Sequence, residues 1–157
     1  MPPKLLFDLD ELDLDTQVFG PKEIRHRNSQ RHEMEFLDGV LHFDAENRRI
    51  VGEHRARDDE FWVRGHFPER PVFPGVLMIE TAGQLCSFFY SEIFQSTKVM
   101  GFAACTDVKF RGTIVPGDRM IILCQGIDMR PRIAKFNTQV IVEGDLKFQG
   151  TIVGMPI

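Results

Sequence analysis

The stretch PGVLMIETAGQLCSFFYSEIF, residues 74–94, decides the fold that this sequence predicts. It is apolar nearly all round, and Glu80 and Glu92 are its only charged residues. A helix of this kind is buried on most of its faces. Pro74 suits the first turn, where its missing N–H would be unpaired anyway. Gly83 lowers helix propensity in the interior, which indicates close packing by a neighbouring element.

Strand-like segments flank this helix on both sides. Short turn sequences separate several of them: AEN at 45–47, VPGD at 115–118 and EGD at 143–145. A single helix cannot cover both faces of a parallel sheet, so the sheet is expected to be antiparallel and curled around the helix. The fold class predicted is therefore α+β. The expected strands are 37–44, 48–56 and 61–67 before the helix, and 99–112, 119–129, 133–142 and 146–155 after it.

Composition fits one domain of 157 residues, with 43% hydrophobic and 27% charged residues. Fourteen phenylalanines against one tyrosine and one tryptophan indicate aromatic burial or an apolar cavity lined by phenylalanine. The net charge of −4 lies entirely in residues 1–24, and no basic stripe typical of a nucleic-acid binder is visible. We expect an acidic N-terminal arm at 1–24 and a single domain at 25–157. The alternating DLDELDLD of the arm could form a short amphipathic element, but we favour a solvated or partly ordered extension.

The three cysteines form no CxxC pair and no zinc-ligand spacing. Cys86, Cys105 and Cys124 stand in apolar surroundings, so buried thiols in a reducing compartment are expected. The first residues lack the pattern of a signal peptide, and no apolar run reaches about 18 residues. We expect a soluble cytoplasmic protein.

One helix face and the segment before it carry the candidate chemistry. Val76, Glu80 and Gln84 lie one turn apart on one stripe. A carboxyl group among apolar residues is costly to ionise, so Glu80 suits a general acid oriented by Gln84. His66 is the natural base, and the first N–H groups of the helix, at Gly75 and Val76, suit a carbonyl oxygen that gains negative charge. Such a set fits removal of a proton beside a carbonyl with loss of a β-hydroxyl group, although a structural histidine and a hydrogen-bonded Glu–Gln pair remain the alternative.

Residues 65–84, GHFPERPVFPGVLMIETAGQ, resemble the active-site segment of the FabZ-type β-hydroxyacyl-acyl carrier protein dehydratases. The related FabA branch carries aspartate at the acid position, so Glu80 favours the FabZ type. Residues 100–110 and 108–120 are also similar to the family, and the resemblance runs from about residue 30 to the C-terminus. The matching positions of the motif are His66, Phe67, Pro68, Pro71, Pro74, Gly75, Val76, Leu77, Glu80 and Gln84.

The resemblance implies a hot-dog fold, an antiparallel sheet wrapped around one long central helix. It implies homodimers, in some members three per hexamer, in which His66 of one subunit meets Glu80 of the other. The Gly75 N–H would polarise the thioester carbonyl of a (3R)-hydroxyacyl chain, and the product would be the trans-2-enoyl thioester of fatty acid biosynthesis. The chain would ride on the phosphopantetheine of acyl carrier protein, with no metal or dissociable cofactor.

Other outcomes stay open at this point. The same fold could serve a non-catalytic acyl-carrier or lipid-binding protein, a thioesterase, or an enzyme of a specialised lipid or polyketide-like pathway. An acidic carrier protein would need a basic surface. The candidates for that surface are Lys109, Arg111, Arg130, Arg132 and Lys135. The remaining histidines match no motif and are expected at the surface or in the sheet: His26, His32, His42 and His54.

Overall fold

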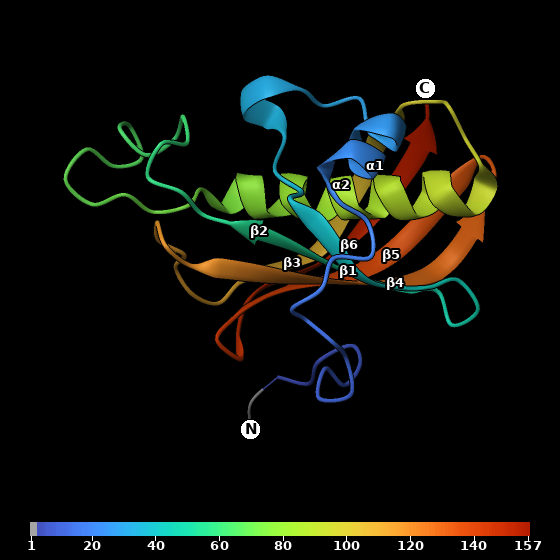
Figure 1. Cartoon of the computed structure of the whole chain (residues 1–157), viewed down its shortest axis with the longest axis horizontal. Helices are drawn as coiled ribbons and strands as arrows, with labels where there is room; N and C mark the ends of the chain where they lie inside the picture. The colour runs from blue at the N-terminus through green and yellow to red at the C-terminus, as the bar shows by residue number, and fades with distance from the viewer. Residues whose placement is uncertain (1–2) are drawn as a thin grey trace.

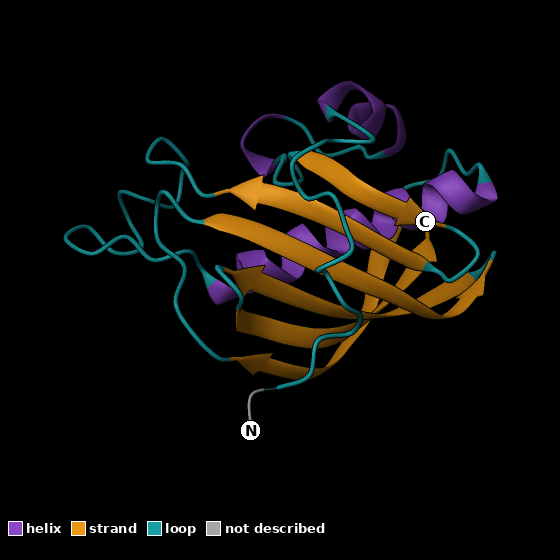
Figure 2. Ribbon diagram, turned by 60° about the horizontal axis from the view of Figure 1, so that its bottom comes forward, coloured by secondary structure: helices purple, strands orange, loops and turns teal. Residues whose placement is uncertain are grey.

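A long helix, α2 (Gly75–Phe94), lies against one face of an antiparallel six-stranded sheet in the computed structural model, which describes residues 3–157 (Figure 1). The sheet curls around the helix, as Figure 2 shows. This arrangement confirms the predicted α+β class. The strand order across the sheet is β1 (Gly39–Asp44), β2 (Arg49–Arg55), β4 (Arg119–Arg130), β5 (Ile133–Val142), β6 (Asp145–Pro156) and β3 (Met100–Phe110).

Helix α2 begins one residue later than predicted, because Pro74 is its N-cap. At the other end Gln95 adopts the left-handed conformation with φ 50°, and its N–H donates to the Ser91 carbonyl. The apolar faces of α2 are covered by the sheet and by the segments before β1. Within residues 3–157, no helix combines the length and the hydropathy needed to cross a membrane.

Six of the seven predicted strands are confirmed, with ends that differ by a few residues. The turn at 143–145 contains Glu143 at φ 49° and Gly144 at φ 83°, the two positive φ values that a tight hairpin turn requires. In the turn at 115–118 the Asp118 N–H donates to the Val115 carbonyl at 3.1 Å, and the Asp118 carboxylate accepts from the Val115 N–H at 2.9 Å.

The strand expected at residues 61–67 was wrong. This segment forms consecutive turns, in which the Val63 N–H donates to the Glu60 carbonyl at 3.1 Å and the His66 N–H to the Trp62 carbonyl at 2.8 Å. Of its aromatic residues only Trp62 is buried, at 3% exposure with its ring edge-on to that of Phe73, whereas Phe61 and Phe67 are exposed. Two short helices were missed, α1 (Pro21–Arg27), which crosses the predicted boundary at residue 24, and the 3₁₀ helix η1 (His32–Met34).

Phenylalanine rings fill the core between α2 and the sheet. This agrees with aromatic burial as the main reason for the unusual composition. Exposed rings also occur, and they gather on β3 and on the 61–67 segment. The fully buried rings are those of Phe36, Phe73, Phe88, Phe89, Phe136 and Phe148.

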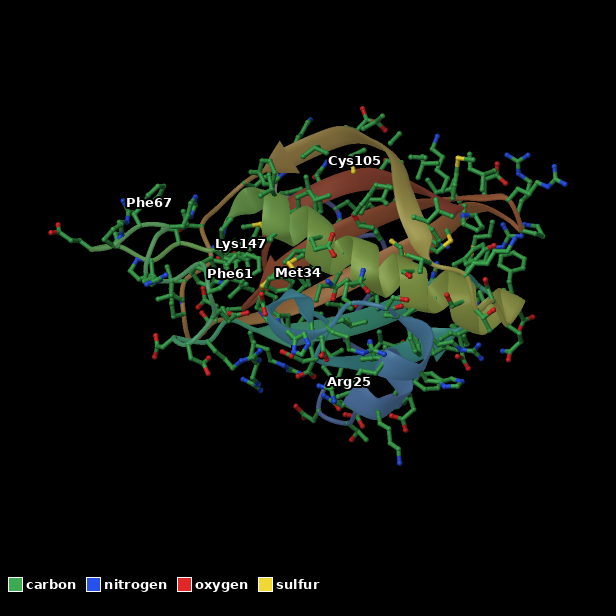
Figure 3. All side chains as sticks on the ribbon, turned by 90° about the horizontal axis from the view of Figure 1, so that it is seen from above. Arg25, Met34, Phe61, Phe67, Cys105 and Lys147 are labelled. Carbon is green, nitrogen blue, oxygen red and sulfur yellow. The ribbon has the colours of Figure 1, made fainter. Side chains whose placement is uncertain are left out.

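Two of the three cysteines are buried as expected, and one is not. The Cys86 and Cys124 sulfur atoms lie 3.4 Å apart between α2 and β4, and burial raises the pKa of the Cys124 thiol well above its ordinary value. Cys105 is exposed on β3, so the prediction of a buried thiol was wrong there (Figure 3). Strand β3 is the last in the sheet, and within residues 3–157 no strand pairs with its outer edge.

The acidic arm packs on the face of the sheet opposite α2. Its leucines and Phe7 contact an apolar cluster from β1, β2, β4 and β5, whereas the acids between them are exposed. The Gln139 side chain fixes the arm, because it accepts from the Leu6 N–H at 2.8 Å and donates to the Lys4 carbonyl at 2.9 Å. The arm is therefore the amphipathic element that its alternating sequence allows.

Removal of the Phe7 ring tests whether the arm stabilises the sheet. Phe7 is 8% exposed, and the Arg49 guanidinium lies 5.2 Å from its ring centre. Phe7→Ala should lower the free energy of unfolding by about 2–4 kcal/mol, measured by urea denaturation. Asp8→Ala, at an exposed neighbour, should change it by less than about 0.5 kcal/mol. Equal effects would mean that the arm adds nothing to stability.

Candidate active site

His66 lies on the loop of residues 56–74, which connects β2 to α2 and projects beyond the start of the helix (Figures 1 and 3). Phe67, labelled at the outer end of this loop in Figure 3, stacks on the His66 ring with 4.2 Å between centroids. The His66 Nδ1 lies 2.7 Å from the Val72 carbonyl oxygen. A carbonyl oxygen only accepts, so Nδ1 carries a proton, and in the neutral ring the lone pair is therefore on Nε2. This is the tautomer that a general base needs.

Gln84 joins the candidate acid to the segment before β1. Its Nε2 donates to Glu80 Oε1 at 2.9 Å and to the Met34 carbonyl at 2.7 Å. Its Oε1 accepts from the Phe36 N–H at 3.0 Å and the Leu37 N–H at 3.1 Å. The Gln84 side chain is buried, and these bonds leave it one orientation. Glu80 is therefore held by a partner that cannot rotate, as the one-turn spacing of the two residues predicts.

The start of α2 offers unpaired donors. Among residues 3–157, the N–H groups of Gly75 and Val76 donate to no other protein group, as expected for the first turn of a helix. A methyl group on Gly75 would come within 2.9 Å of the Phe110 ring. Glycine is thus required here for the packing of β3 against the helix start. Its predicted role beside a substrate carbonyl stays a prediction.

Within residues 3–157, no hydrogen bond or ion pair joins His66 to Glu80. The imidazole of His66 is bound to Val72, and the carboxylate of Glu80 is bound to Gln84. Strand β3, whose outer side is open, runs past the start of α2 and ends at Phe110 above Gly75. Within one chain, the candidate base His66 and the candidate acid Glu80 are therefore separate parts of the predicted site.

An apolar hollow lies beside the middle of α2. Its lining includes Gly83, Cys86, Met100, Phe102 and Phe136. A methyl group on Gly83 would come within 2.4 Å of the Phe102 ring, so the predicted close packing at this glycine is confirmed. None of the stripe residues Val76, Glu80 and Gln84 lines this hollow, whereas Gln84 lines a second, more polar pocket that includes Ile24 and Leu37.

His54 belongs to a polar cluster that its sequence position did not reveal. It lies in β2 as expected, but its side chain is fully buried between two carboxylates. Its Nδ1 lies 3.1 Å from Asp38 Oδ2 and its Nε2 lies 2.7 Å from Glu60 Oε1. Neither N–H points straight at its oxygen, so the contacts are close ion pairs and not linear hydrogen bonds. No local sequence pattern predicts this cluster, because Asp38, His54 and Glu60 come from three separate segments of the chain.

The cluster changes the proton affinity of its members. Burial is the largest influence and by itself would lower the pKa of His54, but Asp38 and Glu60 together raise it to about 8. Burial also acts against ionisation of Asp38, and the contacts with His54, Arg55 and Arg57 nevertheless hold its pKa below the ordinary value. The imidazolium form of His54 is therefore the stable one at neutral pH.

The comparisons with known proteins agree with this architecture. The FabA-like domain family matches residues 28–153. The "3-hydroxyacyl-[acyl-carrier-protein] dehydratase FabZ" of Rickettsia felis is 34% identical over 135 residues, covering 85% of this chain and 92% of that protein. The protein of the same name from Sorangium cellulosum is 32% identical over 126 residues, covering 78% of this chain and 81% of that protein.

Solved structures give the same fold at low sequence identity. The dehydratase heterocomplex ApeI:P from Xenorhabdus doucetiae matches with a TM-score of 0.71 and 11% identity, covering 85% of this chain and 90% of that chain. A hypothetical thioesterase from Streptococcus pneumoniae, solved with coenzyme A, matches with a TM-score of 0.59 and 6% identity, covering 75% of this chain and 84% of that chain. The helix wrapped by an antiparallel sheet thus defines a hot-dog protein. Within that class, the chain belongs to the FabA-like family, and the relatives named above are FabZ dehydratases.

Replacement of the Gln84 amide tests how much its hydrogen bonds contribute to the stability of the fold. Gln84→Leu keeps a similar volume but leaves the buried N–H groups of Phe36 and Leu37 without an acceptor, and should lower the free energy of unfolding by about 2–4 kcal/mol. Urea denaturation measures the loss. The control is Gln149→Leu, whose half-exposed amide accepts from Arg111, and it should lose less than about 1 kcal/mol. A loss no greater than that of the control would contradict the assignment.

The raised pKa of His54 predicts a pH-dependent stability. Folding raises this pKa from 6.5 to about 8, so the folded chain binds a proton that the unfolded chain releases. The stabilisation is complete below pH 6.5 and is lost as pH rises through 8, a fall of about 2 kcal/mol. Urea unfolding from about pH 6 to about pH 9 measures it. His54→Gln should show no such step, and a step of equal size in that variant would assign it to another group.

Proposed function

We propose that this protein dehydrates (3R)-hydroxyacyl chains carried on acyl carrier protein to trans-2-enoyl chains, as a step of fatty acid biosynthesis. The observation that carries the proposal is the state of the two candidate catalytic groups. Val72 holds His66 with Nε2 free, and Gln84 holds the Glu80 carboxyl at the end of a buried network. Both residues stand in the motif that resembles the FabZ dehydratases, and the named relatives carry that activity in their descriptions.

Each group has one role in the proposed reaction. His66 Nε2 removes a proton from C2 of the acyl chain, and the thioester oxygen gains negative charge that the Gly75 N–H stabilises. Glu80 then donates its proton to the hydroxyl group on C3, which leaves as water while the C2–C3 double bond forms. Return of the proton from His66 to Glu80 restores both groups for the next turnover. Gln84 orients the Glu80 carboxyl throughout, and Val76 shares the donor end of the helix.

The proposed site is completed by a second copy of the chain. Open edge strands pair readily with another strand, and β3 is an open edge whose residues are largely exposed. Phe102 and Phe110 on β3 are 50% and 51% exposed, and Phe67 on the projecting loop is 54% exposed. A two-fold pairing of β3 strands would bury these rings and place the loop of one subunit against α2 of the other. This supports a site formed from His66 of one subunit and Glu80 of the other.

The substrate part of the proposal rests on the apolar lining of the hollow beside α2, with Phe102 and Met100 at its border with β3. The free space in the hollow is about 20 Å³, so the proposal requires its lining side chains to move when an acyl chain binds. The basic residues proposed for carrier-protein docking are all exposed, although Arg130 is paired with Asp128 at 2.9 Å. Lys109 and Arg111 stand at the end of β3, near the start of α2 where the proposed site lies.

Hydration of a trans-2-enoyl acyl-carrier thioester, the reverse reaction, is the direct assay. His66→Ala and Glu80→Gln should each lower kcat by about 10²–10⁴-fold or more, because each removes one proton-transfer group. His26→Ala, at an exposed histidine of α1, should keep wild-type turnover. Release of free thiol in place of hydration would favour a thioesterase, and carrier binding without turnover would favour a binding protein. A parallel coenzyme A series across chain lengths defines the preferred substrate.

Mixing two inactive variants tests the shared site. In a heterodimer of His66→Ala with Glu80→Gln, one of the two sites receives an intact histidine and an intact glutamate. Statistical exchange of subunits should therefore restore about one quarter of wild-type turnover. Glu80→Gln mixed with the double variant should stay inactive. No recovery in the first mixture, despite proven exchange, would place both groups in the same chain and leave the dehydratase assignment untouched.

A further inference from the structure

A single buried imidazole connects the two segments on which the predicted active site depends. The Asp38 side of the cluster adjoins Phe36 and Leu37, whose N–H groups bind Gln84 and thereby fix Glu80. The Glu60 side lies in the loop that carries His66. His54 stands between them, at the end of β2.

On the loop side, two hydrogen bonds of backbone N–H groups connect the Glu60 turn with His66. Glu60 Oε2 accepts from the Arg57 N–H at 2.7 Å, so this carboxylate closes the turn at residues 57–60 while its other oxygen meets His54. Trp62, two residues on, accepts from the His66 N–H at 2.8 Å. Release of Glu60 from His54 therefore frees the turn that leads directly into the His66 position.

The contacts on the other side fix the position of β1. Asp38 Oδ2 accepts from the Arg55 N–H at 2.7 Å and lies 3.3 Å from the Arg57 guanidinium. Leu37, next to Asp38, is 5% exposed and packs in the core, so a shift of Asp38 would be transmitted to the Gln84 acceptor. One proton on His54 thus affects both halves of the site.

The surroundings of His54 leave the two carboxylates as its polar neighbours. Arg57 reaches the far side of Asp38, and β4 contributes Met120, which pairs with His54 in the sheet. The Phe36 and Phe73 rings cover the remaining sides, with centroids 5.4 and 5.7 Å from the imidazole centroid. With an oxygen of a carboxylate facing each ring nitrogen, only the doubly protonated ring avoids placing a lone pair against a negative charge.

We propose that His54 is a positioning residue, whose imidazolium form holds the Glu80 support and the His66 loop together and makes turnover depend on its protonation. The role in turnover rests on the proposed dehydratase function, but the role in holding the loop does not. When His54 loses a proton, one of its ring nitrogens places a lone pair against Asp38 or Glu60. Because Glu60 belongs to the 56–74 loop, weakening of its contact with His54 loosens that loop.

Hydrogen exchange on the wild-type protein tests the loop directly and needs no activity. Amide protection factors of residues 57–67 and 34–38, corrected for the intrinsic effect of pH, should fall as pH rises through the range where the His54 ring titrates by NMR. Protection of the β4–β5 pairing should stay constant over the same range. Constant protection at 57–67 while His54 loses its proton would overturn the proposal.

Two substitutions separate the charge from the side chain. His54→Gln removes the charge and should lower kcat by about ten- to hundredfold, with KM changed less than about threefold, because the reacting groups are misplaced and not removed. His54→Lys keeps a cation through the whole range in which imidazole titrates. It should recover most of kcat and move the alkaline limb of the pH–rate profile upward. His26→Gln, at an exposed histidine without a carboxylate partner, is the matched control and should follow wild type.

The outcomes distinguish this proposal from the dehydratase assignment. A wild-type pH–rate profile in folded His54→Gln, or an alkaline limb unmoved in folded His54→Lys, would overturn the positioning role even if the enzyme dehydrates as proposed. If no thioester is hydrated at all, the dehydratase assignment fails, and the exchange experiment still decides whether His54 holds the loop. If His54→Gln does not fold, exchange in the wild type and the profile of His54→Lys decide the matter.

Discussion

The side-chain amide of Gln84 is the contact on which the candidate site depends. Glu80 is a half-buried carboxylate on a largely buried helix, and Gln84 supplies it with a fixed hydrogen-bond donor. The amide can do so because its oxygen is held by the Phe36 and Leu37 N–H groups and its nitrogen also by the Met34 carbonyl. Since the orientation of Gln84 is set by the segment before β1, that segment is part of the site although it supplies no catalytic group.

Both faces of the sheet carry apolar residues, and each face is covered by a different part of the chain. The face toward α2 is filled by phenylalanine rings, whereas the opposite face carries aliphatic residues such as Val51 and Leu123 that would meet water. The arm covers part of this second face with alternate leucines and turns its acids outward. The net charge of the protein is therefore displayed on the face away from α2, whereas the hollow beside the helix has apolar walls.

Much of this fold follows from the sequence, because α2 and the long strands have strong and local signals. The apolar run after Pro74 and the turn residues at 143–145 were sufficient to place their elements to within a few residues. The strand predicted at 61–67 was wrong because aromatic and β-branched residues occur in strands as well as in packed turns. The packing of Trp62 against Phe73, which the local sequence does not reveal, decides between the two. The short helix α1 is stabilised by contacts with α2, such as the Arg27–Glu92 ion pair at 2.9 Å, which no local pattern contains.

The candidate site divides in the same way. Glu80 and Gln84 are one helical turn apart, so their contact could be predicted from spacing alone. His66 could be identified by its motif, but the tautomer that suits a base depends on Val72, across a turn of the loop. His54 had no signal at all, because Asp38 lies 16 residues before it and Glu60 on a loop six residues after it, and neither spacing suits a helix or a strand.

His66 and His54 would need opposite proton states in the roles proposed for them. His66 meets a neutral carbonyl oxygen at Nδ1, so the neutral ring has its lone pair on Nε2, the tautomer that can accept a proton there. His54 meets carboxylates at both nitrogens and holds its proton to about pH 8, which is the state that attracts two anions. A base must be free to change its charge during turnover, whereas an ion pair that holds a loop must keep its charge. In the proposed roles, the half-buried imidazole of His66 changes its charge during turnover and the fully buried imidazole of His54 keeps it.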